Sequence, residues 1–204
     1  MNIHLYLCMR NRDENKELLI RQKAIELIVK HGLDGFSMNK VAKAAKVSPA
    51  TLYIYFKDKD DFISRLSMEI AEKMIGYSLK NFDPEMGFEA GLSVQWKNRL
   101  EFLLEHMNEM EFLEIMRYSS YYEKVTQKIT ETFGDAMSRF IKNSVKKGEL
   151  MELPFEVYWS VAFAPLYQLI KFHNQGNSYA NGTFILTEDL LKQAFNLVVK
   201  ALKP

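Results

Sequence analysis

The 204-residue chain has very little cysteine: Cys8 is the only one. One cysteine excludes an internal disulfide framework and a cysteine-rich zinc site, and it fits a reducing compartment such as the cytoplasm. A membrane span is not expected either, because it needs about 18 uninterrupted apolar residues, and the closest run, residues 157–170, is broken by Ser160, Pro165 and Gln168. The short apolar stretch at the start has no basic residue before it and no small-residue cleavage site after it, so we expect no signal peptide.

The patterns that accompany catalysis and metal binding are missing as well. The sequence has no phosphate-binding glycine loop, no helix with two histidines at metal spacing and no nucleophile elbow around a serine. Its four histidines, His4, His31, His106 and His173, are scattered along the chain. We therefore expect no enzyme, no metal site and no cofactor.

The charge is nearly balanced overall but unevenly distributed. The chain has 27 basic and 26 acidic residues, a net charge of +1. Residues 16–59 contain nine basic and four acidic side chains, a net charge of +5, whereas residues 60–204 carry −4. Between Ser37 and Lys57 there are four lysines and no acid. Such segregation favours a nucleic-acid-binding module joined to a second, different part.

Helical periodicity extends over nearly the whole chain, which predicts an all-α fold. Ser37, Ser48 and Thr187 are placed as N-caps, and Pro49 is suited to a first helical position. Asp58 is placed to cap the start of a long helix, with acids in the first turn as the helix dipole favours. The predicted helices cover about 16–31, a short one from residue 37, 49–56, 58–80, 93–110, 112–126, 127–147, 154–174 and 187–202.

The domain boundaries follow from these elements. Residues 1–15 are interpreted as an N-terminal arm, residues 16–62 as a DNA-binding domain and residues 63–204 as a second helical domain. The long helix 58–80 is expected to be the only element that joins the two domains directly. Two short helices joined by a tight turn and buttressed by a longer one are typical of a helix-turn-helix DNA-binding unit.

The residues of this unit carry a family resemblance. Residues 36–62, FSMNKVAKAAKVSPATLYIYFKDKDDF, closely resemble the signature of the tetracycline-repressor (TetR) family. The most recognisable parts are Val47-Ser48, Thr51-Leu52-Tyr53, Tyr55-Phe56 and Lys59. The sequence departs from the family pattern at Lys46, where glycine is usual, and at Val41, where isoleucine is usual. Lysine in the turn must be accommodated without glycine's conformational freedom or under modest strain.

The resemblance implies a set of DNA contacts. Pro49, Ala50, Thr51, Tyr53 and Tyr55 are expected to face the DNA, with Thr51 and Tyr53 chiefly on phosphates. The resemblance also places Lys59 on the DNA backbone and assigns Leu52 and Phe56 to the core. The residues themselves also place the hydroxyls of Ser37 and Ser48 near the same surface, where they can contact phosphates. Lys46 is either a further phosphate contact or a solvated lysine of the turn.

Base recognition is less well specified by this sequence. Pro49, Ala50, Ile54 and Tyr55 lack the bidentate groups of Arg, Asn or Gln that discriminate a base pair by about 1–3 kcal/mol. Contacts with thymine methyl groups and the shape of the DNA are expected to supply much of the specificity.

The resemblance further implies a C-terminal domain that dimerises and binds a small molecule. Helical spacing of this kind is more often plain core than interface, but the family resemblance places a four-helix dimer seam on the last two long helices. The candidate dimer residues are Val157, Val161, Ala164, Leu190, Ala194, Leu197 and Val198.

The middle helices are rich in large aromatic residues and methionines, which suit an adaptable apolar cavity and also ordinary core. The candidate effector-pocket residues are Trp96, Phe102, Met107, Phe112, Met116, Arg117, Tyr121, Phe133, Met137, Phe163 and Tyr167. Arg117 is the polar residue of this set that could orient a ligand. The expected ligand is apolar or amphipathic.

These observations predict a ligand-responsive repressor that binds a palindromic duplex DNA operator as a homodimer and is released by its effector, as the resemblance implies. Two alternatives remain open: a helical protein-interaction module, and an activator of another helix-turn-helix lineage. An interaction module would need no acid-free stretch from Ser37 to Lys57, and the Thr51-Leu52-Tyr53 context weakens the other lineage.

Overall fold

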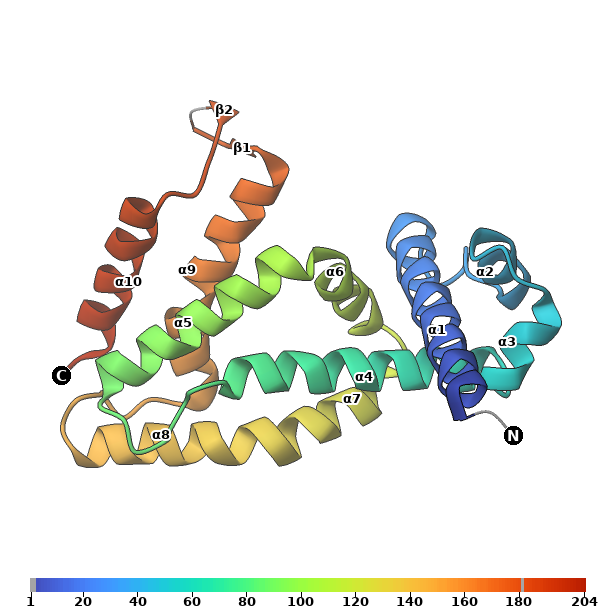
Figure 1. The fold of residues 1–204 in the computed structure, drawn as a ribbon. Helices are drawn as coiled ribbons and strands as arrows, with labels where there is room; N and C mark the ends of the chain where they lie inside the picture. Colours follow the sequence, from blue (N-terminus) through green and yellow to red (C-terminus); the bar gives the residue numbers. More distant parts are fainter. Residues whose placement is uncertain (1–2, 181) are drawn as a thin grey trace. The chain divides into compact units, whose positions relative to one another are not determined.

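The computed structural model describes residues 3–180 and 182–204, and these residues are mainly helical (Figure 1). The all-α class is confirmed, with one short two-stranded hairpin added. None of the helices in the described ranges combines the length and apolar character needed to cross a membrane. In chain order the elements are α1 (Ile3–His31), α2 (Met38–Ala44), α3 (Pro49–Tyr55), α4 (Lys59–Leu79), α5 (Phe88–Glu105), α6 (Met107–Met116), α7 (Tyr122–Ile129), a π-helical turn (Thr130–Gly134), α8 (Asp135–Lys146), α9 (Phe155–Gln175), β1 (Asn177–Ser178), β2 (Gly182–Thr183) and α10 (Glu188–Leu202).

The chain forms two compact units. Unit 1 contains the chain up to Glu72 together with Met107–Lys128, and unit 2 contains Lys73–His106 and Ile129–Pro204. The sequence predicts a domain boundary at residue 62, with everything beyond it in one domain. The grouping differs because a segment from the middle of the chain, which contains α6 and α7, packs with the N-terminal helices. The chain therefore crosses between the units three times, so α4 is not their only connection.

Unit 1 is held together by the buried faces of α1 to α4. Leu52 and Phe56 are 0% and 1% exposed, which confirms their predicted place in the core. The ring of Phe56 stacks on that of Phe62 with centroids 4.0 Å apart, and the Arg21 guanidinium lies 5.5 Å from the Phe56 centroid. The other buried apolar residues of these helices are Ile20, Ala24, Ile25, Ile28, Met38, Val41, Ala42, Ile63, Leu66, Ile70 and Ala71.

The first helix is longer than its sequence pattern predicts. The sequence predicts a helix over residues 16–31 preceded by an arm over 1–15, but α1 spans Ile3–His31. The helical backbone thus takes in most of that arm, while residues 1–2 lie outside the described residues. The predicted end is confirmed, because Lys30 and His31 occupy the last turn and Gly32 follows with a φ of 68°.

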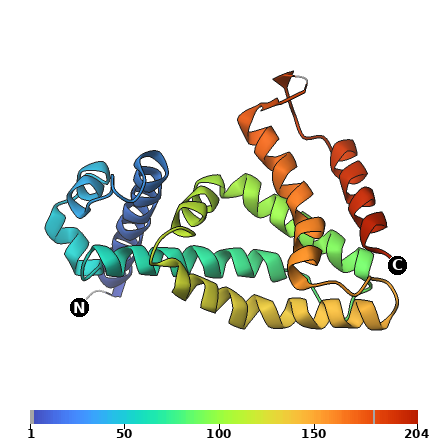
Figure 2. The same cartoon turned by 180° about the vertical axis from the view of Figure 1, so that it is seen from behind.

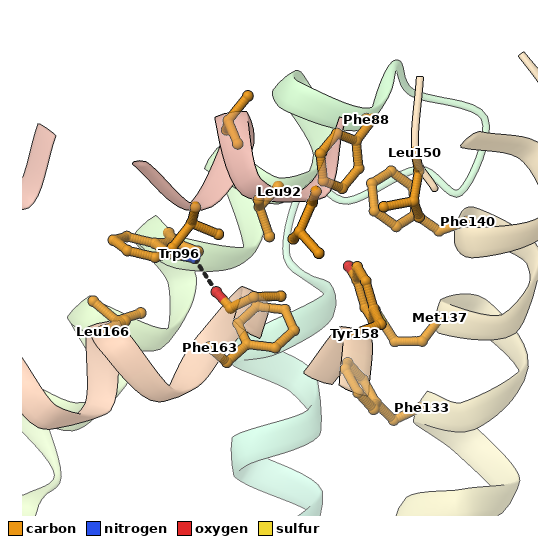
Figure 3. Packing of buried hydrophobic residues seen from close by; sticks show 14 of the residues in the cluster. Phe88, Leu92, Trp96, Phe133, Met137, Phe140, Leu150, Tyr158, Phe163 and Leu166 are labelled. Atoms are coloured by element: carbon orange, nitrogen blue, oxygen red, sulfur yellow. Dashed lines mark hydrogen bonds between the residues drawn. The ribbon is translucent and has the colours of Figure 1, made fainter. Parts of the chain in front are cut away.

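Unit 2 packs α5, α8, α9, α10 and the end of α4 around an aromatic core. α9 packs against α10 and α5, and α5 also packs against α8 (Figure 2). Gly91 allows the close approach of α5 to α8, because a Cβ at this position would lie 2.3 Å from Cε2 of Phe140. The indole nitrogen of Trp96 donates a hydrogen bond of 2.8 Å to the Ala162 carbonyl (Figure 3). This bond fixes α5 to α9 within the core.

Several local features of unit 2 depart from the predicted helices, and the helix expected over 93–110 is observed as α5, Phe88–Glu105. The helix expected over 127–147 contains the π-helical turn Thr130–Gly134, with α8 beginning at Asp135. The loop expected over 173–186 contains the hairpin, in which Asn177 pairs with Thr183 and Ser178 with Gly182. The side chain of Thr187 accepts a hydrogen bond from the Leu190 backbone N–H at 3.3 Å, so this predicted N-cap is confirmed.

Candidate functional site

The two short helices of unit 1 begin as their sequence predicts. The Ser37 side chain accepts a hydrogen bond from the Lys40 backbone N–H at 3.3 Å, and the Ser48 side chain accepts one from the Thr51 N–H at 3.2 Å. Each serine has extended backbone angles and therefore acts as an N-cap. The hydroxyls of Ser48 and Thr51 also lie 2.9 Å apart and hydrogen-bond to each other. The start of α3 thus presents two hydroxyls and a set of backbone N–H groups on one surface.

The turn between α2 and α3 places Lys46 in a left-handed conformation, with a φ of 55°. The Val47 N–H donates to the Ala42 carbonyl at 3.0 Å, and the Lys46 N–H donates to the Lys43 carbonyl at 3.2 Å. These two bonds form a Schellman motif, in which glycine is the usual residue at the left-handed position. Lys46 therefore adopts the backbone conformation that normally favours glycine. Its side chain is exposed.

The outer face of α3 is open to solvent. Tyr53 and Ile54 are 56% and 78% exposed, whereas Leu52 on the opposite face is fully buried. Pro49 and Ala50 are exposed, and Thr51 and Tyr55 are partly buried. The candidates on α3 therefore share the side that faces away from the unit's core.

Positive charge lies beside this face. Lys43, Lys46 and Lys57 have exposed side chains. Lys40 is also exposed, and its ammonium donates to the Gly35 carbonyl at 2.8 Å. Residues 37–57 contain no acid, and of the four lysines Lys57 interacts with the Asp61 carboxylate just beyond this segment. Such a surface attracts polyanions.

Lys59 is held more firmly than the other lysines. Its ammonium lies 3.5 Å from the Leu33 carbonyl oxygen and 5.7 Å from the Phe36 ring centroid. The side chain is partly buried. This geometry fixes the positive charge of Lys59 beside the turn that precedes α2.

The start of α4 is stabilised by acidic side chains. The Asp58 carboxylate accepts a hydrogen bond from the Asp61 N–H at 2.8 Å, so its predicted capping role is confirmed. Asp61 in turn accepts from the Lys57 N–H at 2.9 Å and pairs with Arg65 at 2.8 Å. The backbone hydrogen bond from Lys57, assisted by Arg65, lowers the pKa of Asp61 below its ordinary value of 3.8.

Five of the predicted effector-pocket residues lie in unit 1. Phe112 and Met116 are fully buried on α6, which packs against α1. Met107 is 42% exposed, and Arg117 is an exposed residue whose guanidinium pairs with Glu114 at 3.0 Å. The fifth, Tyr121, donates a hydrogen bond of 2.6 Å to Asp60 at the start of α4. Burial, together with this hydrogen bond, raises the pKa of Tyr121 to about 12.

The other six pocket candidates lie in unit 2. Trp96, Phe133, Met137 and Phe163 belong to one buried cluster (Figure 3). Tyr167 packs against that cluster and is partly buried. Phe102 is buried elsewhere in the unit, with its ring 5.1 Å from that of Tyr77 and 5.0 Å from that of His106.

The sequence pattern does not predict several buried polar groups of unit 2, and two of these, Arg99 and Tyr158, contact aromatic residues of its core. Arg99 is only 5% exposed, and its guanidinium lies over the rings of Phe133, Trp159 and Phe163. Tyr158 is 1% exposed, and its hydroxyl has no hydrogen-bond partner among the described residues. Burial raises the pKa of Tyr158, while the Arg99 charge opposes that shift. A signal for Arg99 was present, because it follows the inward-facing Trp96 by three residues and so falls on the same helix face.

The predicted dimer residues are distributed over α9 and α10. Val157, Leu190 and Leu197 are 45%, 36% and 68% exposed. Ala164 is exposed, and Val161 and Ala194 are partly buried. Val198 differs from this set, because it is 5% exposed and belongs to the unit's own buried cluster. It therefore fills the core of unit 2 rather than presenting an open surface.

The comparisons with known proteins agree with the geometry of unit 1. Residues 20–66 match the family model of bacterial regulatory proteins of the tetR family. An uncharacterized HTH-type transcriptional regulator of Haemophilus influenzae is 28% identical over 131 residues, which cover 64% of this chain and 68% of the relative. Its name describes a regulator rather than an enzyme.

Solved structures resemble the whole chain. A TetR family transcription regulator from Marinobacter aquaeolei matches with a TM-score of 0.81 at 24% identity, over 95% of this chain and 98% of that one. The transcriptional regulator FadR from Bacillus subtilis, solved in complex with stearoyl-CoA, matches with a TM-score of 0.65 at 19% identity, over 92% and 97% of the two chains. Likeness at this level of identity establishes the fold. The comparisons therefore lead to two findings: residues 20–66 match the tetR family of bacterial regulatory proteins, and the chain as a whole has the fold of solved TetR family regulators.

Proposed function

We propose that the chain is a repressor that binds a palindromic operator in duplex DNA as a homodimer and is released by a small apolar or amphipathic effector. The observation that carries the DNA-binding part is the exposed surface of α2, α3 and the residues that adjoin them, which has four lysines and no acid between residues 37 and 57. Phosphate contacts supply much of the affinity of such a surface, and helix N-termini with hydroxyls fix its register on the duplex. A regulator of this kind acts where the chromosome is, in the cytoplasm.

The proposed phosphate contacts come from three places. Ser37 and Ser48 lie at helix starts, where backbone N–H groups assist them. Thr51 and Tyr53 follow on the first turns of α3, and Lys46 and Lys59 flank the unit with positive charge. Pro49, Ala50 and Tyr55 complete the proposed surface. The exposed Ile54 adds an apolar group suited to thymine methyl contacts.

The proposed homodimer places two such surfaces on one duplex. Two recognition helices must lie about 34–36 Å apart to enter successive major grooves. The exposed apolar residues Val157, Leu190 and Leu197 support a seam on α9 and α10, with Val161, Ala164 and Ala194 beside them. Apolar side chains left open on adjacent helices favour association with a second copy.

The proposed effector binds the aromatic core of unit 2. The concentration of aromatic residues and methionine there suits an apolar or amphipathic ligand. The similarity to FadR, whose structure contains stearoyl-CoA, supports the same ligand class. Trp96, Phe133, Met137, Phe163 and Tyr167 are the proposed lining residues.

Release of DNA requires two states of the protein that the effector distinguishes. The three chain crossings between the units, after Glu72, His106 and Lys128, are the covalent routes for that coupling. The proposed signal therefore runs through α4 and also through the 107–128 segment. Within unit 1, the Tyr121–Asp60 hydrogen bond links that segment to the start of α4.

A double variant tests the DNA-binding part of the proposal. Tyr53→Phe with Lys59→Ala is expected to weaken operator binding and to flatten its dependence on salt, because phosphate contacts release counterions. Gel-shift titration across a salt series measures both effects, on an operator obtained by selecting bound fragments from genomic DNA. Tyr179→Phe with Lys200→Ala, on exposed positions of unit 2, is the matched control and should bind like the native chain.

Equal affinity and equal salt slope for the two double variants would refute the assignment of this surface. Failure of the native chain to bind any selected DNA or to be retained on heparin would instead favour a helical protein-interaction module.

A further inference from the structure

Arg99 on α5 is a buried positive charge without an ionic partner. Its side chain is 5% exposed, and no carboxylate in the described ranges forms an ion pair with it. Arginine is rarely buried to this extent unless it is paired, because removing its charge from water is expensive. The immediate surroundings of the guanidinium therefore need an explanation.

The partners that Arg99 does have are all neutral. Its Nε donates a hydrogen bond of 3.1 Å to the Tyr167 hydroxyl oxygen, and its Nη1 donates to the Gln95 carbonyl at 3.2 Å and to the Gln95 side-chain oxygen. Its guanidinium carbon lies 4.1 Å from the ring centroid of Phe163 and 5.3 Å from that of Trp159. These contacts orient the guanidinium but do not neutralise its charge.

Two donors at this place have no acceptor among the described residues. Nη2 of Arg99 makes no hydrogen bond there, and the Tyr167 hydroxyl, which accepts from Arg99, has its own proton left to donate. Nε, which holds the Tyr167 hydroxyl, and Nη2 belong to the same planar guanidinium, so the two free donors lie close together. A carboxylate or phosphate oxygen is the acceptor that would satisfy both and supply the missing negative charge.

The helix beside Arg99 is locally irregular. Phe133, 5.4 Å from the guanidinium, lies in the π-helical turn Thr130–Gly134, where it is 7% exposed. Single π-helical turns occur frequently at functional sites. The π-helical turn thus contributes one of the aromatic rings that surround the buried Arg99 charge.

We propose that Arg99, together with the Tyr167 hydroxyl, binds the anionic group of an amphipathic effector, with the aromatic residues of unit 2 around its apolar tail. This inference rests on the proposed ligand-responsive function and narrows its ligand class from apolar or amphipathic molecules to acids with an apolar tail. The anionic oxygen belongs either to a free carboxylate or to the phosphate of a conjugate.

Three probes with the same chain length test the inference on the full-length protein. Laurate carries a free carboxylate, lauroyl-CoA carries phosphates at a distance from its tail, and dodecanol carries no charge. Isothermal titration calorimetry is expected to show at least one anionic probe binding about tenfold or more tighter than dodecanol, the ratio that a charged hydrogen bond supplies. Tighter binding of laurate identifies a free carboxylate as the bound group, and tighter binding of lauroyl-CoA identifies a phosphate.

The variant Arg99→Gln should remove that preference, so that the anionic probe and dodecanol bind with similar affinity. Tyr167→Phe should weaken the anionic probe and leave dodecanol unchanged. Arg139→Gln is the matched control, because Arg139 is an exposed arginine of the same unit. Its Nη2 lies 3.6 Å from Oε1 of Glu85. This variant should retain the native preference.

Three results would overturn the inference: dodecanol binding the native chain as tightly as both anionic probes, Arg99→Gln keeping the preference, or no binding of any probe. The first and third need no variant, so the test holds even where Arg99→Gln fails to fold, which circular dichroism detects. Operator binding, measured separately by gel shift, keeps this inference distinct from the proposed function. A chain that binds DNA but prefers no anion contradicts only the role of Arg99.

Discussion

Replacing Lys46 with glycine should change stability and DNA affinity in opposite directions. Lys46 occupies the left-handed position of the Schellman motif with a φ of 55°. Its side chain is exposed and forms no hydrogen bond or ion pair within the described residues. Glycine would therefore relieve the backbone and break no side-chain contact of this kind.

The magnitude follows from two opposing terms. A left-handed conformation costs an L-residue about 1–2 kcal/mol, which glycine avoids. Glycine also has more freedom in the unfolded chain, which offsets about 0.5–1 kcal/mol of that gain. The net stabilisation is about 0.5–1 kcal/mol, or a rise in Tm of roughly 1–4 °C for a chain of this size.

The expected effect on DNA arises from the lost charge. If Lys46 contacts a phosphate in each protomer of the proposed dimer, its removal deletes two contacts. The slope of log K against log salt should then fall in magnitude by about 2, since each contact contributes about 0.9. Affinity should weaken most at low salt, where the lost electrostatic contribution is largest.

Thermal unfolding followed by circular dichroism measures the first effect, and gel shift over a salt series measures the second. Lys46→Ala is the matched control, because it removes the same charge and keeps the left-handed strain. It should bind DNA like Lys46→Gly but unfold at about the native temperature. A Lys46→Gly protein that is less stable than Lys46→Ala would refute the strain argument, and an unchanged salt slope in both variants would refute the phosphate contact.

The remaining predictions concern packing and pH. Gly91→Ala should destabilise the protein by about 1–3 kcal/mol in chemical denaturation, because the new Cβ would lie 2.3 Å from Phe140. Gly76→Ala, on α4, is the control and should be neutral or stabilising, because a Cβ there would meet nothing within 4 Å apart from its own helix backbone. Equal losses in the two variants would contradict the packing argument. Asp61 has a lowered pKa, so its carboxylate stabilises the fold above its ordinary pKa of 3.8 and loses this effect as pH falls through the lower folded value. Asp61→Asn should therefore lower Tm at pH 7 and make Tm decrease less as the pH is lowered. A dependence of Tm on pH equal to that of the native chain would contradict this.

Local chemistry made the DNA-binding unit predictable from the sequence. The capping roles of Ser37, Ser48 and Asp58 depend on residues within three positions of one another, so the sequence alone is enough to identify them, as it is for Thr187 in unit 2. The left-handed turn at Lys46 could be anticipated because a lysine stands where the family pattern has glycine. Contacts of this range are decided by propensity and hydrogen bonding near the residue itself.

Longer-range packing was not predictable in the same way. The pattern of residues 107–128 resembles that of any amphipathic helix pair, and nothing in it indicates that α6 packs against α1. The π-helical turn has no composition that separates it from α-helix. Arg99 stands on an apolar helix face, but its burial depends on aromatic rings from α9 and the π-helical turn, 34 or more positions away.

Selection of bound fragments from genomic DNA, followed by hydroxyl-radical footprinting of the native chain, tests the central claim most directly. The account predicts an enriched palindromic site with two protected half-sites whose centres lie about 34–36 Å apart, or a multiple of that spacing. It also predicts that protection weakens steeply as salt is raised. Selection that enriches no sequence, or a footprint with a single unpaired half-site, would contradict the account.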